Sequence, residues 1–319
     1  MKGLKHVALS AVAFGLLAFT AGCGSNADGK SANGNNGTSL SGDVAIDGSS
    51  TVYPIMEAIA EEYMAEQPNV KVSVGFSGTG GGFKKLIAGD TDISDASRPI
   101  KDEEKAGLEK KAIDYTQFEI AYDGLSVVVN KDNTWVDHLT VDELKKLWLN
   151  SGKTKYWSDI RPEWPKEEVK FYAPGTDSGT FDYFDEVILE KKQIEEKATL
   201  SEDDNTIVNG VSGDKNAIGF FGFAYYYENK DKLKVVPIDS GNGAVEPTHE
   251  SIKNGSYAPL SRPLYLYAAN QSVKEKEQVA DYLEFALENA GEMAEEVGYV
   301  KMQQEKYDED LKKLEELKK

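Results

Sequence analysis

The stretch VAIDGSSTVYP, residues 44–54, sets the pattern of the fold. Its apolar start, residues 44–47, predicts a strand. From Pro54 to residue 66, apolar side chains recur three and four positions apart, which predicts an amphipathic helix. The residues between strand and helix include a glycine, two serines and a threonine. The order strand, small-residue loop, helix is typical of α/β proteins.

The same alternation continues along the chain. Further strands are expected at 70–76, 120–130, 169–172, 217–221, 234–237 and 262–268. Further helices are expected at 82–88, 141–149, 180–192, 273–289 and 307–319. The helix from 141 is announced by Thr140 and Glu143, which form a capping-box pattern. No unit of about 20–50 residues repeats, which argues against a solenoid.

Two more loops resemble the first in composition: FSGTGGGFK at 76–84 and PGTDSGTF at 174–181. Each joins an expected strand to an expected helix. A helix N-terminus carries about half a positive charge and unpaired N–H groups, and it binds oxyanions well. Glycine lets the backbone approach a ligand, and hydroxyls add donors. A single cap needs only one such side chain. Three loops richer than that predict an oxyanion site.

The bulk composition limits the function classes. The 319 residues are enough for two domains of ordinary size. A formal charge of −19 argues against a nucleic-acid partner, because phosphate backbones need clustered lysine and arginine. The same charge repels anions at long range. An anion site must therefore work through local donors.

The N-terminus has the features of an export signal. Two lysines precede the apolar run 7–19, and the small residues Ala21 and Gly22 lead into Cys23, the only cysteine. TAGC at 20–23 resembles a lipoprotein signal, although Thr20 stands where leucine is usual. We expect a signal peptide over 1–22 and lipidation of Cys23. Residues 23–43, rich in Gly, Asn and Ser, are expected to form a flexible tether. This places the protein outside the cytoplasm, anchored by lipid to the outer face of the membrane.

Few side chains suit catalysis. One cysteine cannot form an internal disulfide or a cysteine zinc site. His6, His138 and His249 are far apart in sequence. We therefore expect neither a metal nor another cofactor, and no enzyme activity. Two other classes stay open: a phosphatase-like hydrolase that uses a serine with a lysine partner, and a surface adhesin or co-receptor that only retains the fold.

The loops occur together with other short motifs. They are SRPI (97–100), IAYDG (120–124), LTVDEL (139–144), YWSDI (156–160), NAIGF (216–220) and YAPLSRPL (257–264). The ordered set closely resembles the PstS family, the phosphate-binding proteins of high-affinity phosphate ABC transporters. The likeness covers about residues 44–300, and Ser178-Gly179-Thr180 is its most specific single motif.

The resemblance implies a two-domain type II periplasmic-binding-protein fold of the α/β class, with a hinge of two crossing strands. Domain I is expected at 44–120 plus 262–319, and domain II at 121–261. The hinges are expected near 120–125 and 256–264. The family captures inorganic phosphate in the cleft between the domains and delivers it to the permease subunits of an ABC importer. A monomer is expected.

Matching motif by motif, the resemblance implies a set of phosphate-binding residues: Ser50, Thr51, Val52, Ser77, Thr79, Gly80, Arg98, Ser178, Gly179 and Thr180. Two positions depart from the family. Pro174 stands where many members have an arginine, and Arg98 stands where many have an aspartate that accepts the phosphate proton. We interpret Arg98 as the relocated cation. Asp95, Asp123 and Asp177 are alternatives for the lost acceptor. Because that acceptor helps to reject sulfate, other oxyanions stay open as ligands: sulfate, molybdate, a phosphonate or a phosphate ester.

Overall fold

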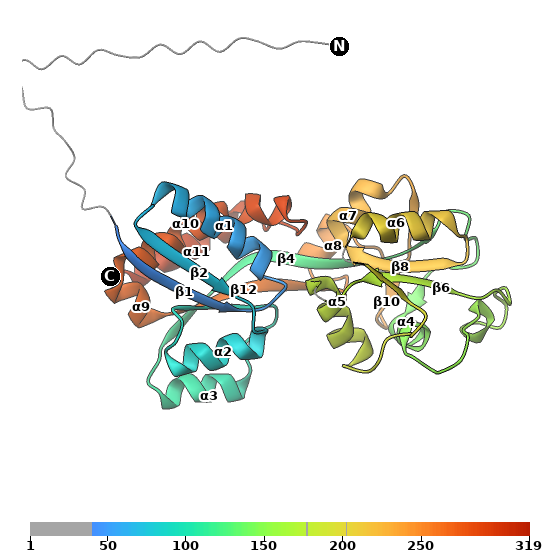
Figure 1. The fold of residues 1–319 in the computed structure, drawn as a ribbon, viewed down its shortest axis with the longest axis horizontal. Helices are drawn as coiled ribbons and strands as arrows, with labels where there is room; N and C mark the ends of the chain where they lie inside the picture. Colours follow the sequence, from blue (N-terminus) through green and yellow to red (C-terminus); the bar gives the residue numbers. More distant parts are fainter. Residues whose placement is uncertain (1–39, 177, 202) are drawn as a thin grey trace, which may run out of the picture. The chain divides into compact units, whose positions relative to one another are not determined.

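The computed structural model describes residues 40–176, 178–201 and 203–319 (Figure 1). The expected signal peptide, Cys23 and nearly all of the expected tether lie outside these residues. No helix in this part of the chain has the length and apolar character to cross a membrane.

A sheet of nine strands runs through the described residues in the order β2-β1-β3-β12-β4-β8-β6-β7, with β9 paired to β4. The strands are β1 (Gly42–Gly48), β2 (Val70–Gly75), β3 (Ile93–Ala96), β4 (Tyr115–Asn130), β6 (Lys170–Pro174), β7 (Thr199–Ser201), β8 (Ala217–Gly222), β9 (Leu233–Val235) and β12 (Ser261–Ala269). A smaller sheet holds β5 (Leu139–Thr140), β10 (Ile238–Asp239) and β11 (Ala244–Val245). Strands β1, β2 and β3 are parallel, so their carboxyl ends meet at one edge of the sheet.

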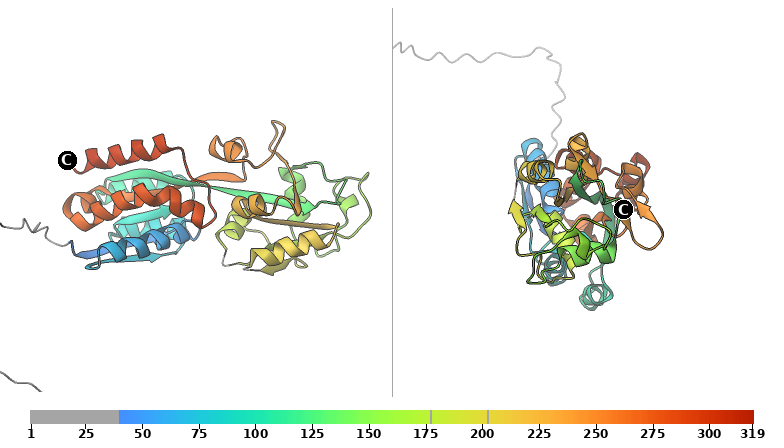
Figure 2. Two further views of the ribbon diagram at one scale, coloured as in Figure 1. Left: turned by 90° about the horizontal axis from the view of Figure 1, so that it is seen from above. Right: turned by 90° about the vertical axis from the view of Figure 1, so that its right-hand side faces the viewer.

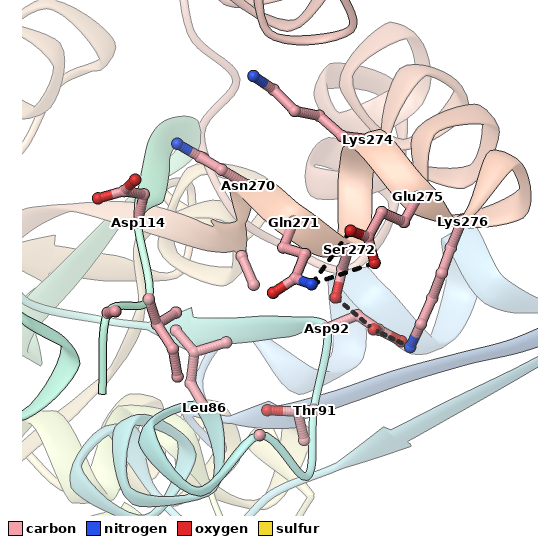
Figure 3. A pocket seen from close by; sticks show the side chains of 14 residues that line it. Leu86, Thr91, Asp92, Asp114, Asn270, Gln271, Ser272, Lys274, Glu275 and Lys276 are labelled. Atoms are coloured by element: carbon pink, nitrogen blue, oxygen red, sulfur yellow. Dashed lines mark hydrogen bonds and ion pairs between the residues drawn. The ribbon is translucent and has the colours of Figure 1, made fainter.

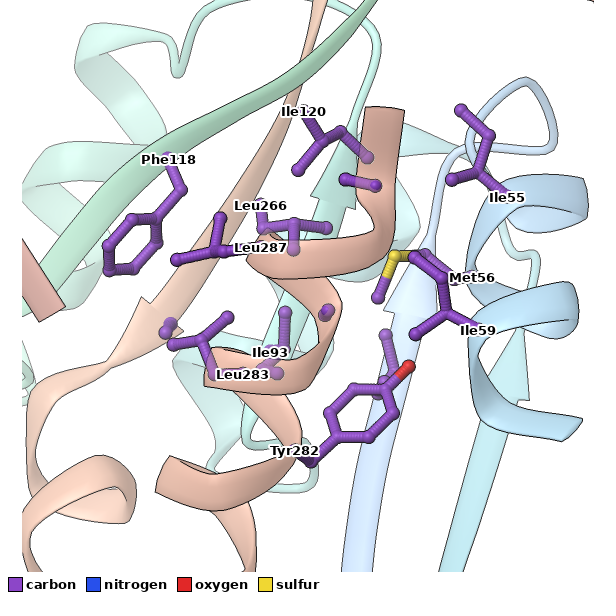
Figure 4. Packing of buried hydrophobic residues seen from close by; sticks show 14 of the residues in the cluster. Ile55, Met56, Ile59, Ile93, Phe118, Ile120, Leu266, Tyr282, Leu283 and Leu287 are labelled. Atoms are coloured by element: carbon purple, nitrogen blue, oxygen red, sulfur yellow. The ribbon is translucent and has the colours of Figure 1, made fainter. Parts of the chain in front are cut away.

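We call the part built on β1, β2 and β3 the first lobe. Its helices are α1 (Tyr53–Glu66), α2 (Thr79–Ala88), α3 (Asp102–Lys110), α9 (Asn270–Glu275), α10 (Glu277–Glu296) and α11 (Gln304–Leu317). Helices α1, α10 and α11 cover one face of the sheet, and α2 and α3 cover the other (Figures 1 and 2). On the first face, Ile55 and Ile59 of α1 pack with Leu283 of α10 in a fully buried cluster (Figure 4).

We call the part built on β6, β7 and β8 the second lobe. Its helices are α4 (Val141–Trp148), α5 (Gly179–Phe184), α6 (Asp204–Gly213), α7 (Phe223–Asn229) and α8 (His249–Lys253); a 3₁₀ turn spans Trp157–Asp159 and a π-type turn Asp185–Leu189. A separate apolar cluster forms its core. Trp148, Phe184 and Phe220 meet there at ring-centre distances of 4.0 to 5.5 Å. Each lobe therefore has its own core.

Two strands connect the lobes. The first half of β4 pairs with β12, and its second half pairs with β8 and β9 of the second lobe. Across the β4–β12 ladder, Arg262 is the register partner of Asp123 and Ser261 that of Gly124. The expected two-strand connection is thus present. The domain boundaries at 120/121 and 261/262 stay a prediction.

The capping box before α4 is confirmed. Thr140 Oγ1 accepts a bond from the Glu143 N–H at 3.1 Å, and Glu143 Oε2 accepts one from the Thr140 N–H at 2.9 Å. The helix expected at 273–289 is instead two helices, because Lys276 between them has an extended backbone while its Nζ bonds Asp92 at 2.7 Å. The helix expected at 180–192 ends as an α-helix at Phe184 and continues as the π-type turn.

Candidate functional site

The first loop lies between β1 and α1, at the carboxyl edge of the sheet. The Ser49 N–H donates to Asp95 O at 3.1 Å, and the Thr51 N–H donates to Ser49 Oγ at 3.2 Å. A side chain at position 48 would place its Cβ 2.1 Å from Asp95 O, so the close approach of β1 and β3 requires Gly48. The loop is therefore fixed by its own hydroxyls and by the neighbouring strand.

The second loop, between β2 and α2, is organised by Asp47. The Ser77 N–H donates to Asp47 Oδ1 at 3.1 Å, the Ser77 hydroxyl bonds the same oxygen, and Lys85 Nζ lies 2.5 Å from Oδ2. Burial disfavours the ionised form of Asp47, but the bonds from Lys85 and Ser77 outweigh it and lower its pKa. Asp47 therefore stays ionised and holds the loop.

Thr79 and Arg98 continue this side of the site. Thr79 Oγ1 accepts a bond from the Ser97 N–H at 3.2 Å and so ties the start of α2 to the end of β3. Arg98 lies next to Gly80, and its two Nη atoms lie 2.9 Å and 2.7 Å from the two carboxylate oxygens of Glu104. The Arg98 side chain is 20% exposed, so it does not extend into bulk solvent.

The third loop comes from the second lobe and meets the first. Ser178 caps α5, with its Oγ accepting a bond from the Thr180 N–H at 3.2 Å. The Thr51 hydroxyl donates to Gly179 O over 3.4 Å. A Cβ at position 179 would lie 2.7 Å from Thr51 Cα, so a residue larger than glycine fits only if the two loops move apart.

Two adjoining cavities lie at these loops. We call the smaller one, of about 330 Å³, the donor pocket; it is lined by parts of the first and second loops and by Arg98. We call the larger one, of about 870 Å³, the outer cleft; it is lined by Ser77 and the third loop, with Tyr53 and Phe76. Ser50, Gly78 and Asp182 line both cavities. The structure thus brings the three loops to one place.

The predicted residues divide between these cavities. Those lining the donor pocket are Ser50, Thr51, Thr79, Gly80 and Arg98. Those lining the outer cleft are Ser50, Ser77, Ser178, Gly179 and Thr180. Val52 lines neither, because its side chain is fully buried in the core and its N–H donates to Ser49 O at 3.1 Å.

Sequence reasoning missed Arg262 as a site residue. It lines the donor pocket from β12, with Nη2 3.0 Å from Thr51 Oγ1 and Nε 3.3 Å from Asp123 Oδ2. The available signal was the arginine inside the motif YAPLSRPL, in a segment expected to cross between the domains. Its nearness to the first loop depends on the β4–β12 register, which the sequence does not state.

The carboxylates near the site have distinct surroundings. Asp95 lies in neither cavity; burial first, and then the charge of Asp47, raise its pKa well above the ordinary value. Burial also raises the pKa of Asp123, with Arg262 acting in the opposite direction. Asp177 lies outside the described residues. Asp182 and Glu186, which the sequence reasoning did not single out, line the donor pocket. They follow Ser178 at intervals of four, a spacing that places side chains on one helical face.

A further pocket lies at the other end of the first-lobe strands, before β3 (Figure 3). Its buried carboxylate, Asp92, accepts bonds from Ser272 at 2.7 Å, from Lys276 at 2.7 Å and from the Ala45 N–H at 3.0 Å. These contacts join α9 and α10 to the sheet, which is a structural role. Among the described residues, no group of three or more His, Cys, Asp or Glu side chains is placed to hold a metal ion.

Comparison with known proteins gives consistent matches. The model of the PBP superfamily domain matches residues 33–290. The chain is 44% identical over 319 residues to the phosphate-binding protein PstS of Staphylococcus saprophyticus, which covers 99% of this chain and 96% of that protein. Its fold is similar to that of a possible phosphate binding protein from Planctomyces limnophilus, with a TM-score of 0.85 and 44% identity over 88% of this chain and 100% of the other. It is also similar to a protein from Clostridium perfringens assigned as a phosphate ABC transporter substrate-binding protein and solved with bound phosphate. That match has a TM-score of 0.56 and 28% identity over 82% of this chain and 100% of the other.

Proposed function

The chain belongs to the PstS phosphate-binding proteins of the PBP superfamily, and we propose that it captures inorganic phosphate outside the cytoplasm and delivers it to the permease subunits of an ABC importer. The names of its relatives support the ligand and the transporter class. The residues of the chain itself support the mode of binding.

The observation that carries this proposal is the convergence of three strand-to-helix loops on two adjoining cavities. Backbone N–H groups and hydroxyls in these loops are neutral donors, and a tetrahedral oxyanion accepts bonds from several directions at once. Such donors stabilise an anion in a water-poor site without full charge neutralisation. This resolves the conflict between an anionic ligand and a chain of charge −19.

The proposed phosphate ligands are the predicted residues that line one of the two cavities: Ser50, Thr51, Ser77, Thr79, Gly80, Arg98, Ser178, Gly179 and Thr180. Ser77 and Thr79 already bond Asp47 and Ser97, so their loop is preorganised for the anion. Val52, whose N–H bonds Ser49 O, supports the first loop from the core side.

Capture follows from the two connecting strands. Phosphate docks on the loops of the first lobe, and the Ser178–Thr180 turn of the second lobe completes the enclosure through bending at β4 and β12. The permease then recognises the closed form. We also propose that the functional unit is a monomer.

Isothermal titration of the purified protein with phosphate tests the proposal. We expect binding heat that fits a micromolar or lower dissociation constant for phosphate. Weak competition is expected from sulfate, molybdate, a phosphonate and a phosphate ester. Absence of heat with phosphate, together with binding of one of the other anions, would replace the assigned ligand and keep the architecture.

We propose that the bound anion is released unchanged. A hydrolase needs an activated nucleophile with a base, or a metal. Incubation with a chromogenic phosphate ester should give no turnover above that of buffer. Turnover that is lost in Ser50→Ala would instead assign a hydrolase.

The membrane attachment is proposed through a lipid on Cys23 after removal of residues 1–22. A diacylated cysteine followed by the tether holds the globular part at the outer face of the cell membrane. The test is labelling with radioactive palmitate in cells. Wild type should carry the label and sediment with membranes, whereas Cys23→Ala should carry none. Equal membrane association of both proteins would refute the anchor.

A further inference from the structure

The two arginines of the donor pocket differ in their partners. Both Nη atoms of Arg98 face the two oxygens of Glu104, at 2.9 Å and 2.7 Å, and Nη1 also bonds Pro99 O at 3.1 Å. A carboxylate therefore already occupies the fork of this guanidinium. Held in this way, Arg98 adds positive charge to the pocket but has few donors left for another anion.

Arg262 is held by an acidic residue, Asp123, and by an aromatic ring, that of Tyr183. Its Nε lies 3.3 Å from Oδ2 of Asp123, whose side chain is 2% exposed, and its guanidinium carbon lies 3.6 Å from the ring centre of Tyr183. A buried ion pair and a stacked aromatic ring fix the plane of an arginine side chain. The Arg262 side chain is itself only 11% exposed. Its orientation is therefore set by the protein before any ligand binds.

The outer side of Arg262 faces the loops. Nη2 bonds Thr51 Oγ1 at 3.0 Å, which brings the guanidinium against the first loop. Nη1 lies 3.8 Å from Glu186 Oε2, beyond hydrogen-bond distance, and the Glu186 side chain is 48% exposed. An ion pair with a half-exposed acid at this distance is weak. An oxyanion can therefore take the place of Glu186 at small cost.

We propose that Arg262 is the principal cationic contact of the bound oxyanion and that Glu186 competes with the oxyanion for it. This inference rests on the proposed function, and it concerns Arg262 and Glu186 among the charged residues of a pocket that Lys101 and Lys191 also line. An arginine offers two parallel N–H donors to a tetrahedral anion. Thr51 belongs to the first lobe and Glu186 to the second, so the exchange of Glu186 for phosphate takes place where the lobes meet.

Titration of the purified full-length protein and its variants with inorganic phosphate tests this inference. Arg262→Gln should weaken binding about 100-fold or more, and Arg262→Lys about tenfold, because lysine keeps the charge but loses the planar pair of donors. Glu186→Gln should strengthen binding about threefold to tenfold, since a competitor is removed. The gain should exceed that of Glu190→Gln, which removes the same charge away from the pocket.

Two variants serve as matched controls. Arg161→Gln removes an arginine that is forked onto Glu143 in the second lobe, and Glu190→Gln removes an acid four residues beyond Glu186 that pairs with Lys145. Neither residue lines the donor pocket. Both variants should bind phosphate within about twofold of wild type, because charges that do not line the pocket are partly screened from it by salt.

The outcomes distinguish failure of the proposed function from failure of the roles proposed for Arg262 and Glu186. No binding by wild type contradicts the proposed function itself. Binding by wild type together with unchanged affinity in Arg262→Gln contradicts the role of Arg262 alone, and a Glu186→Gln variant no tighter than Glu190→Gln contradicts the competition. Arg262→Gln leaves Asp123 buried without its partner, and circular dichroism shows whether this variant folds. If it does not fold, the phosphate affinities of the double variant Arg262→Gln/Asp123→Asn and of Arg262→Lys test the role of Arg262.

Discussion

Ser50 Oγ donates a 2.7 Å hydrogen bond to Asp182 Oδ2, so that a residue of the first loop is joined to one on α5 that lies 132 positions later in the chain. Both residues line the donor pocket and the outer cleft. Asp182 thus places an acceptor among groups that are otherwise mainly donors. An ionised carboxylate repels an anion unless that anion carries a proton to share.

Asp182→Asn should therefore reduce the preference for phosphate over sulfate. Phosphate retains at least one proton at neutral pH and sulfate has none, so the carboxylate favours phosphate in two ways, by accepting its proton and by repelling sulfate. We expect the ratio of the two dissociation constants to fall about tenfold or more, as befits one charge-assisted hydrogen bond. Competition titration with both anions measures it. An unchanged ratio would show that another group selects the anion.

Gly179→Ala should weaken phosphate binding about tenfold or more. The added methyl group would lie 2.7 Å from Thr51 Cα, and backbone atoms cannot turn aside as a flexible side chain can. The first and third loops must then separate. Gly213→Ala in α6 is the control, since its methyl group would meet nothing within 4 Å. Equal affinity in the two variants, measured by titration, would contradict the closeness of these loops in the bound state.

The local parts of the site were predictable from the sequence. Each is one continuous unit of about ten residues, in which a strand is followed by a glycine- and serine-rich loop and by the first turn of a helix. Parallel pairing then brings such loops to the same sheet edge. The capping box of Thr140 and Glu143 was predictable for the same reason: its two partners are three residues apart.

The features of the site and fold that were not predicted depend on contacts between segments that are distant in sequence. Arg262 reaches the first loop only through the register that sets it opposite Asp123. Glu104 was not foreseen as the partner of Arg98, since α3 itself was not among the expected helices. The break lies at Lys276, whose backbone is extended and whose Nζ bonds Asp92, 184 positions away. Helical periodicity alone continues straight through that position.

Leu283→Ala should lower the free energy of unfolding by about 2–5 kcal/mol, since it removes a fully buried side chain between α1, α10 and the sheet and leaves a cavity. Leu200→Ala is the control, because Leu200 is 39% exposed; a change below about 0.5 kcal/mol is expected. Urea denaturation followed by circular dichroism measures both. Similar losses in the two variants would place Leu283 outside the core.

The Glu143–Arg161 pair should make stability depend on pH in the acid range. Arg161 Nε and Nη2 lie 2.7 Å and 2.9 Å from the two Glu143 oxygens. These bonds from Arg161, against an opposing effect of burial, lower the pKa of Glu143 from 4.5 to about 2. Between these values the unfolded chain binds a proton that the native state does not. The stabilisation is therefore complete above about pH 5 and is lost as the pH falls toward 2.

Glu143→Gln should lower the free energy of unfolding by about 2 kcal/mol at pH 7, a value reduced for partial solvent screening, and by less at each step toward pH 3. Arg161→Gln removes the same bonds, so adding Glu143→Gln to it should cost little at any pH. The coupling energy of this double-mutant cycle, obtained from urea denaturation at several pH values, must shrink as the pH falls. A coupling energy that stays constant between pH 7 and pH 3 would contradict an ionised Glu143 in the native state. The ionised residue predicts a fall, because the unfolded chain binds a proton in this range and the native state does not.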